Sequence, residues 1–243
     1  MKTQSKSIFN IFTLFALLAS LIGSAVFVTP VYAASFVVTK TADTADGACN
    51  ADCSLREAII AANAAAGDDT ITVPAGTYTL AIAGANENAA ATGDLDLTSN
   101  ITINGAGAGS TIIQAGTLGV GGPPNGIDRV FHVTGAFTVN ISGVTVRNGN
   151  VGGNIGGGIY NSGGTLTITN STFSGNSASD VAGGGIYNEN TLTVANSTFS
   201  GNSAKWGGGI YLATGTATIS NSTFSGNSAT GSDYGGGGIY LNR

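Results

Sequence analysis

Two short motifs recur in the C-terminal part of the chain, and their spacing constrains the fold more than any other feature. GGGIY and NSTFSGNSA return at intervals of about 25 residues, and TLTIT, TLTVA or TATIS lies between them. Each unit therefore contains three short strands separated by turns. A unit of this size cannot bury its apolar face alone, so successive units must stack. The repeats predict an all-β fold, a parallel β-helix with three short strands per coil.

Stacking places equivalent residues of successive coils above one another, about 4.8 Å apart. The expected inward ladders are Ile159, Ile186, Ile210 and Ile239; Leu166, Leu192 and Ala217; Ile168, Val194 and Ile219; and Phe173, Phe199 and Phe224. In an earlier, degenerate coil Ile141 and Val146 take the places of Ile168 and Phe173. We expect about seven coils, with clear repeats from residue 137. Asn170, Asn196 and Asn221 are expected at a turn, where stacked amides can form a ladder.

The N-terminal segment has the pattern of a secretory signal peptide. Lys2 and Lys6 precede an apolar stretch over residues 11–28, and VYA then places small residues at the −3 and −1 positions. This predicts cleavage between Ala33 and Ala34. An uncleaved membrane anchor is the alternative. The expected organisation is a signal peptide over 1–33, a cap over 34–69 and a β-helix over 70–243.

The cap contains both cysteines, in the segment DGACNADCSLREAI. Two thiols four residues apart in an exported, turn-rich segment predict a disulfide between Cys49 and Cys53. Ser54 and Glu57 form a capping box, apolar residues then recur at helical spacing, and Gly67 is a stop signal. We therefore expect one capping helix.

Composition excludes several classes of protein. Charged residues make up 9% of the chain, far below the content of coiled coils and helix bundles. Hydrophobic residues make up 42% with a net charge of only −5, which argues against disorder. This acidic balance provides no basic patch for phosphates, so we expect no nucleic-acid partner. We also expect no cofactor and no metal.

Two family resemblances extend this interpretation. CSLREAI, GDDTITVPAGTYTL, GDLDLT and GAGAGSTII closely resemble the N-terminal module of secreted bacterial CSLREA proteins. The GGGI and FSGN repeats resemble the GGA[ILV] and FxxN motifs of chlamydial-type polymorphic outer membrane proteins. The resemblances imply a right-handed, pectin-lyase-like parallel β-helix that is displayed at the cell surface or released from it. The second family also implies adhesion.

Enzyme candidates are few. Asp94 and Asp96 alternate with leucines, so we expect both carboxylates to face outward, roughly 7 Å apart along the strand. That separation suits inverting glycoside hydrolysis, but neighbouring outward acids are more often a solvated face. His132 alternates with Phe131 and Val133, so we expect a surface histidine rather than a general base.

Variable segments before the glycine triplets form a candidate binding edge. They carry Asp180, Lys205, Trp206, Asp233 and Tyr234. Such loops on a rigid stack are common recognition sites in solenoids. The alternative is a solvated edge without function.

The leading hypothesis is a non-catalytic, secreted or cell-surface β-helix for adhesion or surface interaction, with glycans or a host or neighbouring cell surface as partner. The first alternative is a protein that binds or cleaves polysaccharide. The second is an ice-binding solenoid, because threonines in the TLTIT strands form outward rows. GGGGIYLNR ends the sequence without a cap. We therefore expect that further coils and a membrane anchor are missing and that chains self-associate edge to edge.

Overall fold

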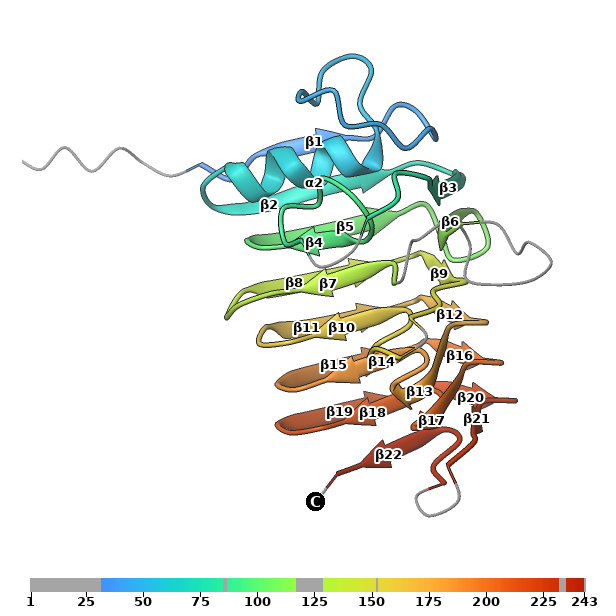
Figure 1. Cartoon of the computed structure of the whole chain (residues 1–243). Helices are drawn as coiled ribbons and strands as arrows, with labels where there is room; N and C mark the ends of the chain where they lie inside the picture. Colours follow the sequence, from blue (N-terminus) through green and yellow to red (C-terminus); the bar gives the residue numbers. More distant parts are fainter. Residues whose placement is uncertain (1–31, 85–86, 117–128, 152, 232–234, 243) are drawn as a thin grey trace, which may run out of the picture. The chain divides into compact units, whose positions relative to one another are not determined.

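The structure is a computed structural model that describes residues 32–84, 87–116, 129–151, 153–231 and 235–242. Within this part, short parallel strands return to the same faces at each turn of the chain, and the coils stack along one axis (Figure 1). The described residues form a right-handed parallel β-helix with one α-helix among them, as the repeats and the resemblance predict. The expected signal peptide lies almost entirely outside the described residues.

The first face is a seven-stranded sheet in the order β1-β2-β5-β8-β11-β15-β19. Its strands are β1 (Ser35–Val37), β2 (Asp68–Val73), β5 (Asn100–Gly105), β8 (Thr138–Ser142), β11 (Thr165–Thr169), β15 (Thr191–Ala195) and β19 (Thr216–Ser220). The second face contains β3 (Gly76–Leu80), β6 (Thr111–Ala115), β9 (Thr145–Arg147), β12 (Thr172–Ser174), β16 (Thr198–Ser200) and β20 (Thr223–Ser225).

The third face contains β4 (Leu95–Leu97), β7 (Phe131–Val133), β10 (Ile159–Asn161), β14 (Ile186–Asn188), β18 (Ile210–Leu212) and β22 (Ile239–Leu241). We call this the tyrosine sheet, because four of its strands carry an outward tyrosine. A smaller sheet contains β13 (Ser177–Ala182), β17 (Ser203–Trp206) and β21 (Ser228–Ala229).

The core consists of the predicted ladders. Ile159 pairs with Ile186 and Leu166 with Leu192, in register along the axis. The ring of Phe199 lies between those of Phe173 and Phe224, with centroids 4.8 and 4.9 Å away. The degenerate coil also aligns as expected, with Ile141 beside Ile168 and Val146 beside Phe173. Apolar residues of the last described coil, such as Phe224 and Ile239, are only partly buried.

The asparagine ladder uses different residues from the predicted set. Asn170, Asn196 and Asn221 do lie at turns, with φ of 50°, 51° and 46°, but their side chains are exposed. The interior ladder is formed by the asparagine of each FSGN motif instead. Asn176 Nδ2 donates to Asn202 Oδ1 at 3.0 Å, and Asn202 Nδ2 donates to Asn227 Oδ1 at 2.9 Å. The prediction was wrong because the exposed asparagines serve the left-handed backbone of the turn.

The glycine triplets allow the coils to approach closely at one corner. Gly183, the first of its triplet, has a φ of +71°, which favours glycine. A Cβ on the following Gly184 would collide with the carbonyl oxygens of Ser203 and Gly208 in the next coil. The corner therefore requires glycine both for its backbone angle and for its packing.

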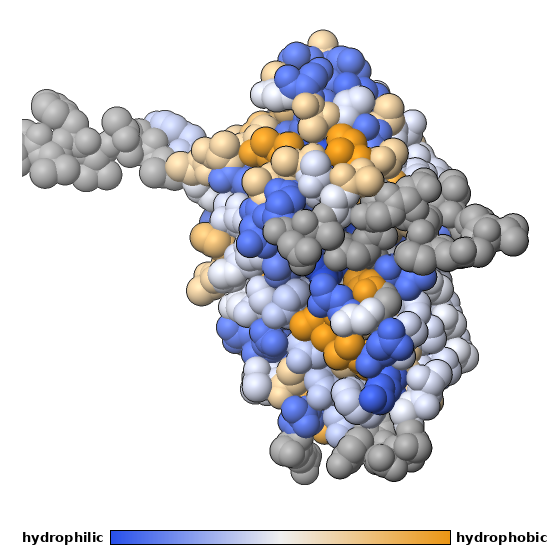
Figure 2. Space-filling model, in the orientation of Figure 1, coloured by the Kyte–Doolittle hydropathy of each residue, from blue (hydrophilic) through white to orange (hydrophobic). Residues whose placement is uncertain are grey.

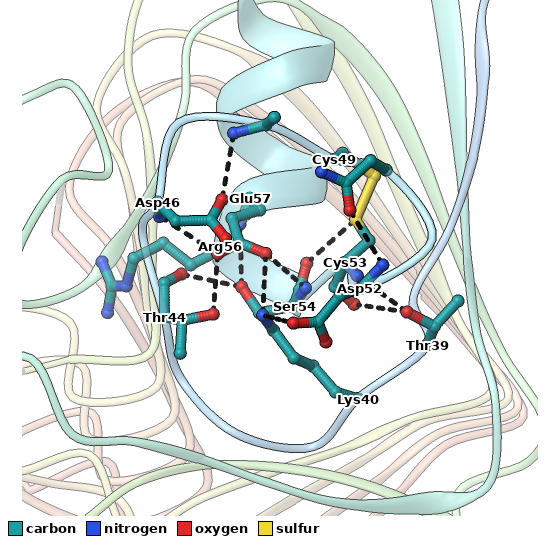
Figure 3. A network of polar contacts seen from close by, with 12 residues as sticks. Thr39, Lys40, Thr44, Asp46, Cys49, Asp52, Cys53, Ser54, Arg56 and Glu57 are labelled. Carbon is teal, nitrogen blue, oxygen red and sulfur yellow. Dashed lines mark hydrogen bonds and ion pairs between the residues drawn. A yellow bond between two sulfur atoms is a disulfide. The ribbon is translucent and has the colours of Figure 1, made fainter.

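The cap has the predicted disulfide and capping box, which Figure 3 shows within one polar network. Cys49 and Cys53 are bonded, with an S–S distance of 2.06 Å. Helix α2 (Leu55–Ala64) begins at the N-cap Ser54, whose side chain accepts the Glu57 N–H while Glu57 accepts the Ser54 N–H. The helix ends before the expected stop at Gly67, because Ala65 is already extended.

Glu57 is the centre of this network. Burial raises the pKa of its carboxyl, but hydrogen bonds from the Ser54 N–H, the Thr44 hydroxyl and the Asp46 N–H, together with the Lys40 charge, lower the pKa to about 2. Glu57 is therefore ionised at any ordinary pH and holds the loop before the helix in place.

Candidate functional site

The outer face of the tyrosine sheet carries a polar or aromatic side chain at the centre of each strand. The register aligns these residues in one column of Asp96, His132, Tyr160, Tyr187, Tyr211 and Tyr240. Their neighbours in the strands, such as Leu95 and Leu97, are buried, since side chains alternate between the two faces of a strand. The column runs from the first coils to the last described strand.

The four tyrosines form what we call the tyrosine column. The Tyr187 and Tyr211 ring centroids are 5.0 Å apart with planes 12° apart, and Tyr211 and Tyr240 stack similarly at 5.2 Å. Tyr160 meets Tyr187 edge-on at 5.6 Å. Because neighbouring rings cover one another's faces, the column offers mainly ring edges and hydroxyl groups to a partner.

Tyr160 carries a fixed hydroxyl donor. Its hydroxyl donates to Glu189 Oε2 at 3.1 Å. Burial and the Glu189 charge raise the pKa of the phenol to about 12. Tyr160 is therefore protonated at neutral pH, and its hydroxyl group has a defined direction.

Asp94 and Asp96 are not the solvated pair that the sequence predicts. Asp96 has no exposed surface and Asp94 is 3% exposed. Asp96 Oδ2 accepts the Ala90 N–H at 3.0 Å, and Oδ1 lies 3.2 Å from His132 Nδ1. Asp94 Oδ2 accepts from Arg129 Nη1 at 3.0 Å. Both acids are on the outer face, but other parts of the chain cover them.

The cover is the segment over residues 87–93, and a buried arginine of the cap holds it. Glu87 accepts the N–H groups of Ala89 and Thr92, which folds the segment on itself. Arg56, fully buried on α2, donates to the carbonyl oxygens of Ala90 and Gly93 at 2.8 Å each. The cap therefore positions the segment that buries Asp96.

A pocket of about 300 Å³ opens beside these residues. Its lining is Glu87, Asn88, Asp94, Arg129, His132, Asn154 and Tyr160. The Arg129 guanidinium lies 5.7 Å from the centroid of the Tyr160 ring, within reach of a cation–π interaction. Hydrogen-bond donors, acceptors and one aromatic ring thus converge in one small volume.

His132 has a buried ring nitrogen, Nε2, within this region. Its ring stacks on Tyr160, with centroids 4.8 Å apart and planes 6° apart. Its Nε2 is buried and has no hydrogen-bond partner among the described residues. If Nδ1 carries the proton and donates to Asp96, Nε2 of the neutral ring is an acceptor. His132 is therefore mostly enclosed, not the surface histidine that the sequence predicts.

The same residues include the ligand types of a metal site. One atom each from Asp94, Asp96 and His132 lies within 4.8 Å of the other two. The Arg129 guanidinium, however, already neutralises Asp94, and both Asp96 oxygens are engaged. This arrangement suits hydrogen bonding to a polar ligand better than coordination of a cation.

Comparison with known proteins identifies the type of repeat. A family model described as the Chlamydia polymorphic membrane protein repeat matches residues 170–189, 196–213 and 221–242. The repeats are of the polymorphic membrane protein type. No curated protein and no solved structure matches the chain. In the described part of the chain, no helix has the length and apolarity needed to cross a membrane.

The column from Asp96 to Tyr240 lies only partly within the polymorphic membrane protein-type repeats. Tyr187, Tyr211 and Tyr240 lie within the three matched segments, whereas Asp94, His132 and Tyr160 precede them. The pocket thus belongs to the irregular coils and the tyrosine column continues into the repeats.

The candidate edge lies on the small sheet. Asp180 and Lys205 are exposed on β13 and β17, and Trp206 pairs with Ala182 across these strands. Lys205 Nζ lies 4.6 Å from the centroid of the Trp206 ring. The structure therefore brings Lys205 and Trp206 together and places Asp180 on the neighbouring strand, while Asp233 and Tyr234 lie outside the described residues.

The threonine rows are also in register on the seven-stranded sheet. Thr165, Thr191 and Thr216 align, as do Thr167, Thr193 and Thr218. Toward the cap, Asn140 interrupts the second row.

Tyr160, Arg56 and Glu87 were missed as site residues from the sequence. Tyr160 had a usable signal, because a residue that follows an inward isoleucine in GGGIY must face outward. Arg56 and Glu87 act through backbone groups of a segment without a repeat, and no local pattern indicates such contacts.

Proposed function

We propose that this protein is a non-catalytic, surface-displayed β-helix that binds a hydroxyl-rich ligand, such as a glycan of a host or neighbouring cell surface. The repeat type supports surface display, because the matched family is one of polymorphic membrane proteins. The observation that carries the proposal is the pocket beside Asp94, Arg129 and His132, whose lining includes Tyr160, the first ring of the tyrosine column.

The chemistry of the pocket supports a neutral or weakly charged polar ligand. Asp94 and Arg129 offset each other's charge, so the pocket lacks the excess positive charge that phosphate groups require. Asn88 and Asn154 can instead donate to and accept from hydroxyl groups, and the His132 ring lines the pocket beside them. A volume of about 300 Å³ is at the lower end of the range for small-molecule sites. The pocket could therefore hold a short part of a polysaccharide.

The tyrosine column supports a linear partner. Its rings follow one another along the axis, with neighbouring centroids 5.0 to 5.6 Å apart. Since this array is attached to a rigid sheet, the protein itself loses little conformational entropy when a polymer binds. On the face seen in Figure 2, strongly hydrophobic residues form small separate patches, and hydrophilic or neutral residues cover most of the rest.

A panel of immobilised neutral and acidic polysaccharides tests the proposal. We expect saturable binding of the mature protein to at least one of them, and at least tenfold weaker binding by His132→Ala. Asp52→Ala is the surface control, because the Asp52 side chain is 71% exposed in the cap and belongs to neither the pocket nor the candidate edge, so this variant should bind normally. Absence of binding across the panel, or equal binding by His132→Ala, would contradict the proposal.

The closeness of Asp94, Asp96 and His132 favours polysaccharide cleavage as a second candidate. The same panel distinguishes it, if reducing ends and unsaturated products are measured after incubation. If cleavage products form with the parent protein and are absent with Asp94→Asn, the protein is a polysaccharide-cleaving enzyme and not only a binding protein. The hydrogen bonds of Asp96 to Ala90 and His132 support a positioning role instead.

The aligned threonines favour ice binding as a third candidate. A regular grid of hydroxyl groups can order water, but Ala195 and Asn140 break the regularity of this face. Thermal hysteresis of the mature protein measures this directly, and we expect none.

A further inference from the structure

Asp69 is a carboxylate that faces the interior of the first coils. It lies on β2, on the same side as Ile71 and Val73, and has no exposed surface. Its neighbour Asp68 is exposed and accepts from Asn100 Nδ2 at 2.9 Å. A buried charge normally requires a charged partner or several hydrogen bonds.

The described residues supply only one partner. Asp69 Oδ1 accepts the backbone N–H of Ala34 at 2.6 Å. Oδ2 is buried and has no hydrogen-bond partner among the described residues, and no ion pair to Asp69 is formed within them. Charged groups on the neighbouring helix are engaged elsewhere, Arg56 with Asp43 and Glu57 with Ser54.

Ala34 is also the residue that the sequence predicts as the first of the exported protein. The two residues before it, Tyr32 and Ala33, are exposed. Ala34 itself is anchored, because its carbonyl oxygen accepts the Thr70 N–H at 2.9 Å and Ser35 pairs with Thr70 in the sheet. Removal of the preceding segment would therefore leave the Ala34 nitrogen beside Asp69.

We propose that cleavage of the Ala33–Ala34 bond creates an α-ammonium group that binds the buried Asp69 and locks β1 onto the solenoid. A peptidase adds water across the peptide bond. The hydroxyl goes to the Ala33 carbonyl carbon, which leaves as a carboxylic acid and ionises, and the Ala34 nitrogen becomes an amine that takes up a proton.

This step changes both the charge and the number of donors at Asp69. The peptide nitrogen of Ala34 has one N–H, whereas the ammonium has three. One can remain on Oδ1 and a second can reach Oδ2. The positive charge also balances the buried carboxylate. The first coil is therefore more stable after processing than before it.

The experiment compares chains that differ only at this contact. One chain begins at Ala34 and the other at Tyr32, each made from a fusion that is removed without residual residues. Each is prepared with Asp69, with Asp69→Asn and with the neighbouring control Asp68→Asn. A seventh sample is the Ala34 chain acetylated at its amino terminus, which removes the charge without changing Asp69.

We expect the Ala34 chain to have an unfolding equilibrium constant about tenfold lower than the Tyr32 chain or the acetylated chain. The difference should vanish in Asp69→Asn and persist in Asp68→Asn. The pKa of the Ala34 amino group, followed by NMR, should exceed the usual value of about 8 and return to it in Asp69→Asn.

Three results would overturn the proposal. The first is a mature amino terminus other than Ala34 in the protein exported from a secreting host. The second is equal stability of the free, acetylated and Tyr32 chains. The third is a pKa of the Ala34 amino group at its usual value. That result would mean that the ammonium group does not interact with Asp69 and that Asp69 has only a structural role. If Asp69→Asn does not fold, the acetylated chain and the pKa still decide the question.

Discussion

His132 and Tyr160 lie face to face, with ring centroids 4.8 Å apart. Each residue also forms a hydrogen bond, the imidazole Nδ1 with Asp96 and the phenol hydroxyl with Glu189. The stack therefore joins the acidic pair of the first coils to the tyrosine column of the repeats. The outer face of the tyrosine sheet thus carries one unbroken column of side chains from Asp96 to Tyr240.

The phenylalanine ladder should be a principal source of stability. Phe199 is fully buried between two stacked rings, so Phe199→Ala should lower the free energy of unfolding by about 3–5 kcal/mol. The control is Phe224→Ala, because Phe224 is only partly buried and its loss should be smaller. Urea denaturation followed by circular dichroism measures both. Equal losses of unfolding free energy in the two variants would show that burial within the ladder does not determine the contribution of each phenylalanine.

The interior asparagine ladder should be sensitive to truncation. Asn202→Ala leaves the Phe173 carbonyl oxygen and the Asn176 N–H without their partner, at a cost of about 1–3 kcal/mol. Asn196→Gly, at an exposed turn with φ of 51°, should change stability by about 0.5 kcal/mol or less. Thermal unfolding of the two variants tests this. A larger loss for Asn196→Gly would argue against the ladder.

The cap should weaken in acid through Glu57. The folded pKa of about 2 lies below the unfolded value of about 4.3. The contribution of Glu57 to stability is therefore complete above the unfolded pKa and is lost as the pH falls toward 2.

The substitution Glu57→Gln should lower stability at pH 7 by about 1–3 kcal/mol and flatten its decline in acid. Urea midpoints between pH 7 and pH 2 measure this. Asp52→Asn is the control, because the side chain of Asp52 is 71% exposed and such ion pairs contribute little. If the stability of Glu57→Gln falls in acid as steeply as that of the parent chain, Glu57 is not the group responsible for the loss.

The disulfide should be present in exported protein and contribute modestly. Non-reducing digestion and mass spectrometry should find one peptide pair linked through Cys49 and Cys53. The closed loop is short, so reduction should lower the free energy of unfolding by about 2 kcal/mol. Helix α2 should persist, because the capping box and Arg56 also hold it. Free thiols on native exported protein would refute the bond.

Much of the fold could be predicted because stacking repeats the same environment in every coil. Ile159 and Ile186, or Phe173 and Phe199, share a position in the motif and therefore a place in the ladder. The asparagines were harder to assign. Asn196 and Asn202 recur with the same period, so periodicity alone does not distinguish the turn residue from the buried one.

The site could be predicted only in part, because its geometry depends on contacts outside the repeats. Alternation correctly places Asp96 and His132 on the outer face. Burial of Asp96 depends on the Ala90 N–H, which Arg56 positions from the helix. No local pattern connects Arg56 to Ala90, so the sequence alone indicated a solvated pair.

The chain has a single histidine, and it lies in the proposed binding pocket. The most direct measurement is therefore NMR of the His132 imidazole while the mature protein is titrated with oligosaccharides of the polysaccharide panel. If the pocket binds glycans, the His132 signals should shift and saturate with the ligand that the panel retains, and Tyr160→Phe should weaken that response. Binding that leaves the His132 signals unchanged would contradict the central claim.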